Sequence, residues 1–212
     1  MHRYNPPQSR WGNAPPPMKA ARSTGSLAMP VQIGAKPDAG FDNPIGLMKD
    51  CHRRVEKFLD ILRMVARSAH GRALAEDESQ AVESALIYFR SSGPLHSRDE
   101  EESLFPRLRA AGAANPLAEH LLMEIAKLED DHCHAAALHR EADEIFSRWC
   151  AGGTLTAKAA VQLEFVTGEL GRIYSTHIAV EEGLIFPRAA ELFTRKELDA
   201  MARELRERRN LG

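Results

Sequence analysis

Several features that define common protein classes are scarce in this chain of 212 residues. Its three cysteines, Cys51, Cys133 and Cys150, are too few and too scattered for a disulfide framework or a metal cage of cysteines alone. No apolar run approaches the roughly 18–20 residues that a membrane-spanning helix needs. Neither sign of charge dominates, because 28 lysines and arginines oppose 30 aspartates and glutamates. This balance argues against a protein that coats nucleic acid or an anionic membrane.

The overall composition is that of a globular protein. A hydrophobic content of 43% and a charged content of 27% are ordinary for such chains. The length suits one domain with an appendage. The sparse cysteines fit a reducing compartment, so we expect a cytoplasmic protein without membrane or nucleic-acid partners. No particular protein partner is indicated.

The first 40 residues differ from the rest of the chain. They hold seven of the twelve prolines, and five basic residues against one acidic residue, so they carry about +4 while the remainder carries about −6. Such a segment has too few apolar residues to offset the entropy lost on ordering. We predict a disordered, proline-rich tail over residues 1–40 and a folded body over residues 41–212. A transit peptide, which is also rich in arginine and poor in acid, is the alternative.

Apolar residues recur through the body with the period of an α-helix. The pattern and the capping residues predict five helices: one from Pro44, capped by Asn43; one from near Glu76, kinked or broken at Gly93-Pro94 and resuming to about Leu108; one from Asn115-Pro116 to about Trp149; one from Thr154 or Thr156 to about Leu192; and a short one opened by a capping box of Thr194 and Glu197. No alternating strand pattern is present. We therefore predict an all-α fold, an antiparallel four-helix bundle with a short extra helix at the C-terminal end.

The two halves of the body repeat a pattern. His52 and His132, 80 residues apart, each end the sequence apolar-x-Asp-x-His. His96 and His177, 81 residues apart, each open the sequence His-x3-Glu-Glu-x2-(Leu/Ile)-Phe-Pro. The repeat predicts two related helical hairpins, whose corresponding positions meet around a pseudo-twofold axis.

The repeated residues suggest a metal site. Residues four apart share one helix face, so each histidine of the longer motif can point into the same volume as its glutamate. These positions and the lone histidines lie on apolar stripes, where an unpaired ionisable group is costly. A metal centre supplies the partners that such groups need. The candidate ligands are His52, His96, Glu100, His132, His177 and Glu181.

The donor count favours two ions. Two bridging carboxylates, four imidazoles and one solvent-derived oxygen bridge provide about five bonds to each ion and leave about one position open. Imidazole and carboxylate without thiolate suit iron, with manganese or zinc as the less favoured alternatives. Two ferrous ions exceed the charge of two glutamates, which makes an oxo or hydroxo bridge reasonable. A reducible pair with an open position suits dioxygen, nitric oxide or peroxide as ligand.

The twice-repeated motif and the two lone histidines resemble the hemerythrin-like family of HHE-type cation-binding four-helix bundles. The resemblance covers about residues 42–190 and implies a non-haem di-iron centre held by the same six side chains. Two features differ from the oxygen-carrying members: Ala136 stands where they have a second histidine, and the last helix has His-x3-Glu in place of His-x4-Asp. The doubled His-x3-Glu is closer to the branch that includes proteins implicated in iron–sulfur repair. Those proteins usually carry an extra N-terminal segment with cysteine, and residues 1–40 have none.

Some neighbouring residues compete with the candidate ligands. His134 is the alternative to His132, although its helical neighbours are more polar, and Glu101 is the alternative to Glu100. Glu101 and Glu182 otherwise suit a solvated face, and Asp50 and Asp130 suit either the surface or a contact with a ligand histidine. The remaining expectations are core packing for Tyr174, whose hydroxyl can reach a bound oxygen ligand, small buried side chains for Cys51 and Cys133, and a helix C-terminus for the arginine-rich end.

Three classes of function follow from these residues. The first is a di-iron protein that binds, senses or buffers a small oxidant. The second is a redox enzyme acting on peroxide or nitric oxide, or an iron donor in iron–sulfur repair. The third is a metal-free interaction bundle, for which substitution of His96 or His177 would leave stability unchanged. A ferritin-like oxidase is disfavoured, because that family needs two Glu-x-x-His motifs and only Glu129-x-x-His132 fits.

Overall fold

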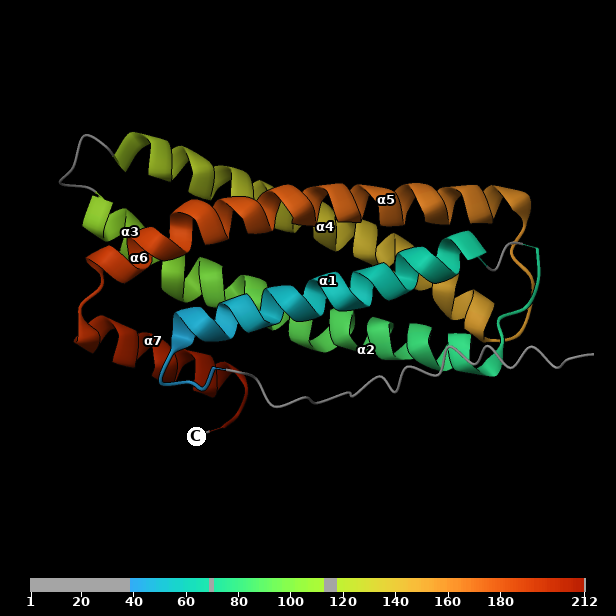
Figure 1. Ribbon diagram of the computed structural model, residues 1–212, viewed down its shortest axis with the longest axis horizontal. Coiled ribbons are helices and arrows are strands. Elements are labelled where there is room, and N and C mark those ends of the chain that lie inside the picture. Colours follow the sequence, from blue (N-terminus) through green and yellow to red (C-terminus); the bar gives the residue numbers. More distant parts are fainter. Residues whose placement is uncertain (1–38, 69–70, 113–117, 212) are drawn as a thin grey trace, which may run out of the picture. The chain divides into compact units, whose positions relative to one another are not determined.

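The computed structural model describes residues 39–68, 71–112 and 118–211, and within these ranges it contains helices and no strand (Figure 1). The predicted all-helical class is confirmed. The disorder predicted for the N-terminal tail falls almost wholly on residues 1–38, which lie outside the described residues. The elements in chain order are α1 (Pro44–Ser68), α2 (Glu76–Asp99), η1 (Glu100–Leu104), α3 (Phe105–Gly112), α4 (Ala118–Cys150), α5 (Ala157–Val180), η2 (Glu181–Ile185), α6 (Phe186–Leu192) and α7 (Arg195–Arg208).

Most helix starts follow the capping signals of the sequence. The Asn43 side chain accepts a hydrogen bond from the Gly46 amide at 3.0 Å and caps α1. Thr156, one of the two candidates for the fourth helix, accepts from the Ala159 amide and caps α5. The predicted capping box of Thr194 and Glu197 opens α7. The predicted start at Asn115-Pro116 lies outside the described residues, and α4 is described from Ala118.

The sequence predicts a kink or a break at Gly93-Pro94, and the break is wrong, because α2 runs through both residues to Asp99. A proline inside a helix removes one hydrogen bond, to the carbonyl four residues earlier. Here Pro94 and Arg90, which carries that carbonyl, are both exposed, so water can satisfy the carbonyl. Burial of Leu86 and His96 on either side favours a continuous helix.

Two short π-helical segments lie at corresponding places in the repeat. η1 begins at Glu100 and η2 begins at Glu181, the two glutamates of the candidate site. Pro106 and Pro187 follow the segments by two residues, and each lacks an amide donor and crowds the carbonyl four residues earlier. Widening the turn relieves that crowding, and such π-bulges are frequent at functional sites. The Phe-Pro of the motif therefore accounts for a local distortion that helical periodicity alone did not predict.

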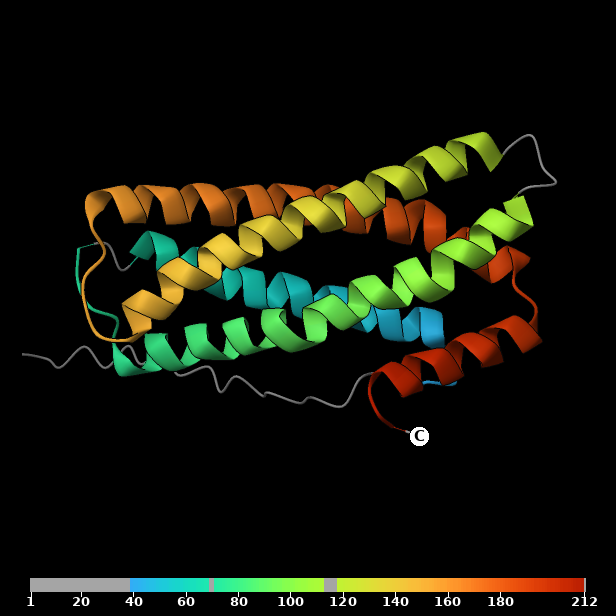
Figure 2. The same cartoon turned by 180° about the vertical axis from the view of Figure 1, so that it is seen from behind.

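Four long helices surround the core. Helix α1 packs against α2 and α5, and α4 packs against the same two helices. Successive long helices run in opposite directions, as Figures 1 and 2 show from the two sides. Each π segment leads directly into the short helix that follows it, so α3 extends α2 and α6 extends α5. None of these helices is long and apolar enough to cross a membrane.

A layer of polar residues divides the buried core. One apolar cluster includes Val55, Ala135 and Ile173, and the other includes Met48 and Leu128. Each lone histidine lies between these clusters along its helix, since His52 falls between Met48 and Val55 and His132 falls between Leu128 and Ala135. The layer that carries the candidate ligands therefore lies between two apolar clusters.

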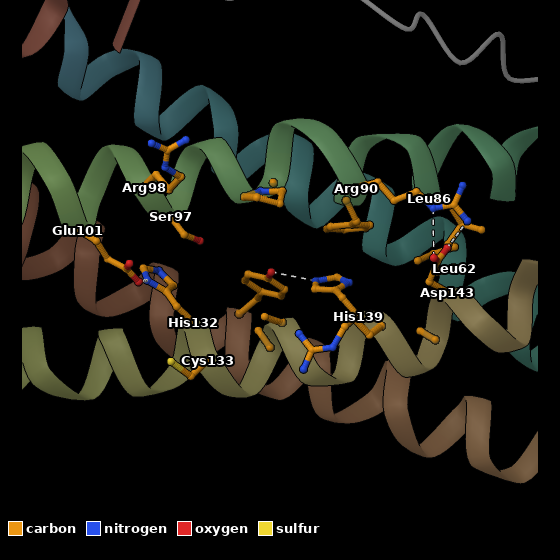
Figure 3. Close-up of a pocket in the computed structure, with 18 residues that line it drawn as sticks. Leu62, Leu86, Arg90, Ser97, Arg98, Glu101, His132, Cys133, His139 and Asp143 are labelled. Atoms are coloured by element: carbon orange, nitrogen blue, oxygen red, sulfur yellow. Dashed lines mark hydrogen bonds and ion pairs between the residues drawn. The ribbon is translucent and has the colours of Figure 1, made fainter. Parts of the chain in front are cut away.

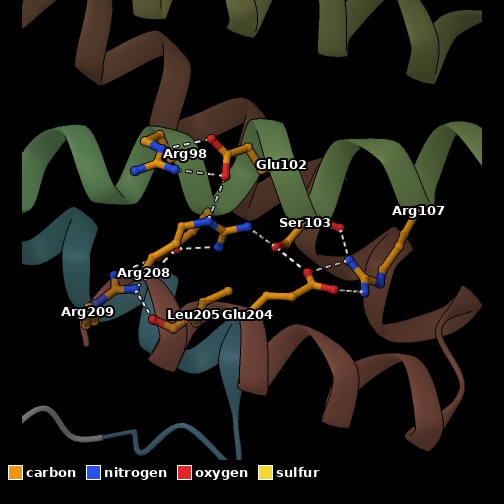
Figure 4. A network of polar contacts seen from close by, with 9 residues as sticks. Arg98, Glu102, Ser103, Arg107, Glu204, Leu205, Arg208 and Arg209 are labelled. Carbon is orange, nitrogen blue, oxygen red and sulfur yellow. Dashed lines mark hydrogen bonds and ion pairs between the residues drawn. The ribbon is translucent and has the colours of Figure 1, made fainter. Parts of the chain in front are cut away.

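Helix α7 lies against η1 and the end of α2 and binds them through charged side chains (Figure 4). Arg208 and Arg209 both pair with the buried carboxylate of Asp99, while Arg107 and Ser103 bind Glu204. The arginine-rich end expected to suit a helix C-terminus therefore has specific acidic partners.

Within the part of the chain that the structure describes, the second half of the repeat has no matching set of charged contacts with α7. At the positions that correspond to Arg98, Asp99, Glu102 and Ser103, it carries Ala179, Val180, Gly183 and Leu184. Asp99, Glu102 and Ser103, which bind Arg208 of α7, are thus polar only in the first half, whereas Arg107 corresponds to Arg188. This difference makes α7 specific to the first half.

Candidate metal centre

The six candidate ligands come from four helical elements and meet inside the bundle. His52 lies on α1, His132 on α4, and the two His-x3-Glu pairs lie at the junctions of α2 with η1 and of α5 with η2. Five of the six are buried, and both glutamates are fully buried, at 0% exposure. The side chain of His132 is 9% exposed and borders a cavity described below.

One group of four donors is formed by His52, His96, Glu100 and Glu181, whose nearest ligand atoms all lie within 4.8 Å of one another. His52 Nε2 is 2.9 Å from Glu181 Oε2. His96 Nε2 is 3.2 Å from Glu100 Oε1. The group therefore joins the two histidines of the first half to a glutamate from each half.

A second group joins the two histidines of the other half to Glu100. His132 Nε2 lies 3.2 Å from Glu100 Oε2 and 3.2 Å from His177 Nε2. His177 Nε2 is also 3.4 Å from Glu181 Oε2. Because Glu100 belongs to both groups and Glu181 borders both, the arrangement offers two neighbouring cation positions with shared carboxylates.

The buried carboxylate oxygens of the site lack hydrogen bonds within the described residues. All four carboxylate oxygens of Glu100 and Glu181 are buried without a donor in hydrogen-bonding geometry, although imidazole nitrogens lie close to them. An unpaired buried carboxylate carries a large desolvation penalty. Nitrogen and oxygen lone pairs directed at a common volume are what a cation requires. The residues present therefore fit a metal centre.

The outward-facing nitrogens of the lone histidines bind acidic residues. His52 Nδ1 lies 2.9 Å from Glu182 Oε1, and His132 Nδ1 lies 2.7 Å from Glu101 Oε1. Each carboxylate comes from the opposite half of the repeat. A carboxylate on the remote nitrogen fixes the ring orientation and makes the other nitrogen a better ligand. His177 Nδ1 has a longer contact of 3.5 Å with Asp131.

These contacts add to the interpretation of the second glutamate in the motif. Glu101 and Glu182, predicted to suit a solvated face, have side chains that are 39% and 41% exposed, and they also contact the two lone histidines. Neither belongs to the two donor groups, and the alternative of Glu101 in place of Glu100 is not favoured. The Glu-Glu pair that occurs in both halves was the sequence feature that could have indicated a role for the second glutamate. Only the packing of the helices shows which histidine each second glutamate contacts.

The aromatic residue of each motif also packs across the repeat. The Phe186 ring stacks on His52 with 5.3 Å between ring centroids, and the Phe105 ring stacks on His132 at 6.3 Å. Each motif therefore contributes two consecutive glutamates and a phenylalanine to the lone histidine of the other half. This cross-repeat packing fixes the position of His52 and His132.

Burial dominates the electrostatics of the centre. It raises the pKa of Glu100 well above its ordinary value, and the nearby Glu181 adds to the shift. For Glu181 burial acts in the same direction, but contacts with His177 and His52 outweigh it, and the net pKa is lowered. Burial, with His52 second, lowers the pKa of His96 well below its ordinary value and keeps that ring neutral, the form that binds a metal.

Other residues considered in the sequence lie elsewhere. His134 is exposed and takes no part in either donor group. Asp50 is buried, but it accepts a hydrogen bond from the Ala39 amide and pairs with Arg53, so its partners lie away from the candidate site. Cys51 is buried as expected, whereas Cys133 is exposed, which corrects that prediction.

Tyr174 and His139 form a pair beside the centre. The Tyr174 hydroxyl and His139 Nε2 are 2.9 Å apart, and the Tyr174 ring meets the His177 ring edge-on. The two residues line a cavity between α2 and α4 (Figure 3). His139 is in neither donor group.

Comparison with known proteins agrees with this geometry. The model of the family described as Hemerythrin HHE cation binding domain matches residues 43–189. An uncharacterized protein of Haemophilus influenzae is 26% identical over 174 residues, which is 82% of this chain and 94% of that protein. The family match spans all six converging residues and ends before α7.

Proposed function

The chain belongs to the hemerythrin HHE cation-binding family, and from this premise we propose that it is a non-haem di-iron protein. One ion is held by His52, His96 and the two glutamates, and the other by His132, His177 and the shared Glu100. One observation supports this proposal most strongly: all four carboxylate oxygens of Glu100 and Glu181 are buried without a hydrogen-bond donor where these histidines meet. A bound cation would offset the desolvation penalty of these two carboxylates.

The donor chemistry supports iron over the alternatives. The set contains imidazole and carboxylate and no thiolate, which suits iron and also admits manganese or zinc. The two fully buried glutamates bring two negative charges, so two divalent ions leave a positive charge that an oxo or hydroxo bridge reduces. Glu182 and Glu101 contact the outer nitrogens of His52 and His132, respectively, and would keep the inner nitrogens directed at the volume that the ions would occupy.

We further propose that the protein binds, senses or buffers a small oxidant: dioxygen, nitric oxide or peroxide. A reducible pair of iron ions supplies a position at which such molecules bind. The apolar clusters on both sides of the layer limit the access of bulk water. Among the described residues, His132 lines the cavity between α2 and α4, which offers such a molecule an approach to the site.

Metal analysis with an optical spectrum tests this proposal. We expect about two iron ions per chain in the isolated protein and an oxo-bridged di-iron absorption in air, altered reversibly by reduction and re-exposure. His132→Ala should lose metal, whereas His134→Ala, two residues away on the same helix but exposed, should keep it. Equal metal content in the two variants, or no iron in the wild-type protein, would refute the assignment.

The same preparation separates the oxidant-binding function from a catalytic one. A reversible spectral change without product supports binding or sensing. Sustained consumption of peroxide or nitric oxide with a supplied reductant supports the redox enzyme, and transfer of iron to an apo iron–sulfur protein supports the iron donor.

A further inference from the structure

A cavity of about 510 Å³ lies between α2 and α4, beside the candidate metal centre (Figure 3). Its walls include His132, Gly93, Ser97 and Tyr174, and the same four residues line a space of about 10 Å³ among the ligand histidines. The large cavity therefore adjoins the centre directly. A water molecule occupies about 30 Å³ in the liquid, so a diatomic molecule or a peroxide fills only a small part of this volume.

Small side chains create the cavity. Gly93 and Ser97 on α2 face Ala135 and Ala136 on α4 across the opening. A larger residue at any of these positions would fill space beside His132. The cavity is thus a consequence of particular residues, and its volume lies in the range of small-molecule sites.

The interior of the cavity is mainly apolar and aromatic. Leu62, Leu86 and Phe89 form part of the wall, and the Phe89 ring stacks on His139 with 4.1 Å between centroids. Burial lowers the pKa of His139 to about 4, so this ring is neutral at pH 7. The neutral His139–Tyr174 pair adds polar atoms to the wall without adding charge.

The charged residues at the cavity differ in whether they have partners. Arg90 is paired with Asp143, Arg98 with Glu102, and Glu101 with His132. Arg140 also lines the cavity and is exposed, and no acidic side chain of the described residues pairs with it. The cavity therefore combines apolar walls with one cation available at its edge.

We propose that this cavity binds an apolar organic anion, an aromatic or short aliphatic carboxylate or sulfonate, whose charged group pairs with Arg140. His132 and Arg140 are eight residues apart on α4, which is about 12 Å along the helix axis. The bound molecule then places its apolar part against the apolar wall of the cavity and its anionic end toward solvent at Arg140. The inference goes beyond the proposed metal site and does not depend on metal being bound.

Fluorescence titration of metal-free protein with two probes tests the site. Anilinonaphthalene sulfonate is an apolar aromatic anion, and phenylnaphthylamine is its uncharged counterpart. We expect one sulfonate probe per chain, bound with a native near-ultraviolet circular dichroism spectrum. Arg140→Gln should weaken the sulfonate about threefold and leave the uncharged probe unchanged. Arg148→Gln, on the same helix and outside the cavity lining, should change neither.

Variants that fill the cavity provide a second test. Ala136→Trp and, from the opposite wall, Ser97→Phe should each weaken both probes at least tenfold. Ala137→Trp, at an exposed position outside the lining, should not. Unchanged binding in both filled variants would show that the probes do not bind in this cavity. Equal binding of the two probes with no effect of Arg140→Gln would show that the cavity does not prefer an anion. Metal content of the same variants is measured separately, so a failure here is distinct from failure of the metal assignment.

Discussion

Asp99 offers a direct measure of what α7 contributes. Its carboxylate is 1% exposed and accepts from Arg208 Nη1 at 2.8 Å and from Arg209 Nη1 and Nη2 at 3.2 and 2.5 Å. Replacing both arginines by alanine leaves this buried charge without its partners. Breaking a buried ion pair costs about 3–5 kcal/mol, so the double variant should lose about that much free energy of unfolding. Arg209→Ala alone, which leaves Arg208 in place, should lose about half.

Urea unfolding in the presence of chelator measures this loss without a contribution from metal. Arg203→Ala, an exposed arginine on α7, is the matched control and should stay within about 0.5 kcal/mol of wild type. Adding Asp99→Val to the double arginine variant should restore much of the stability, because the corresponding residue of the second half is Val180. A double arginine variant as stable as the control would show that α7 does not depend on this ion pair.

Three further predictions concern the centre and its surroundings. Removing metal with a chelator should lower the melting temperature by about 5–10 °C, because ligand at a hundredfold excess over Kd contributes about 2.7 kcal/mol; calorimetry with equal melting temperatures would contradict this. Glu101→Ala and Glu182→Ala should each weaken metal binding about 10–100-fold, with smaller losses for the glutamine variants, in a competition assay with a chromophoric chelator. Burial raises the pKa of Glu204, but its contacts with Arg107 and Ser103 outweigh burial and the net pKa lies below 4.5. The stability that this group adds is therefore present above about pH 4.5 and lost as pH falls through the lowered value. The melting difference between wild type and Glu204→Gln should shrink there and stay constant from pH 5 to 8.

Local sequence determined the helices and most of their ends. The helical period of apolar residues is an intrinsic property of the chain, and Asn43, Thr156 and Thr194 cap the helices they were predicted to cap. The predicted break did not occur at Pro94, where burial on both sides of the proline favours a continuous α2. Tertiary packing outweighed a local signal there, and Pro94 and Arg90, whose carbonyl loses its partner, are both exposed residues.

The repeat likewise determined the six candidate ligands, since residues four apart must share a helix face. Only the tertiary structure decided how the two halves interlock: Glu182 and Phe186 of the second half hold His52, and Glu101 and Phe105 of the first half hold His132. Contacts between helices depend on their relative rotation and distance, which the period of a single helix does not specify. For the same reason the sequence did not predict the cavity between α2 and α4 or the partners of the arginines on α7.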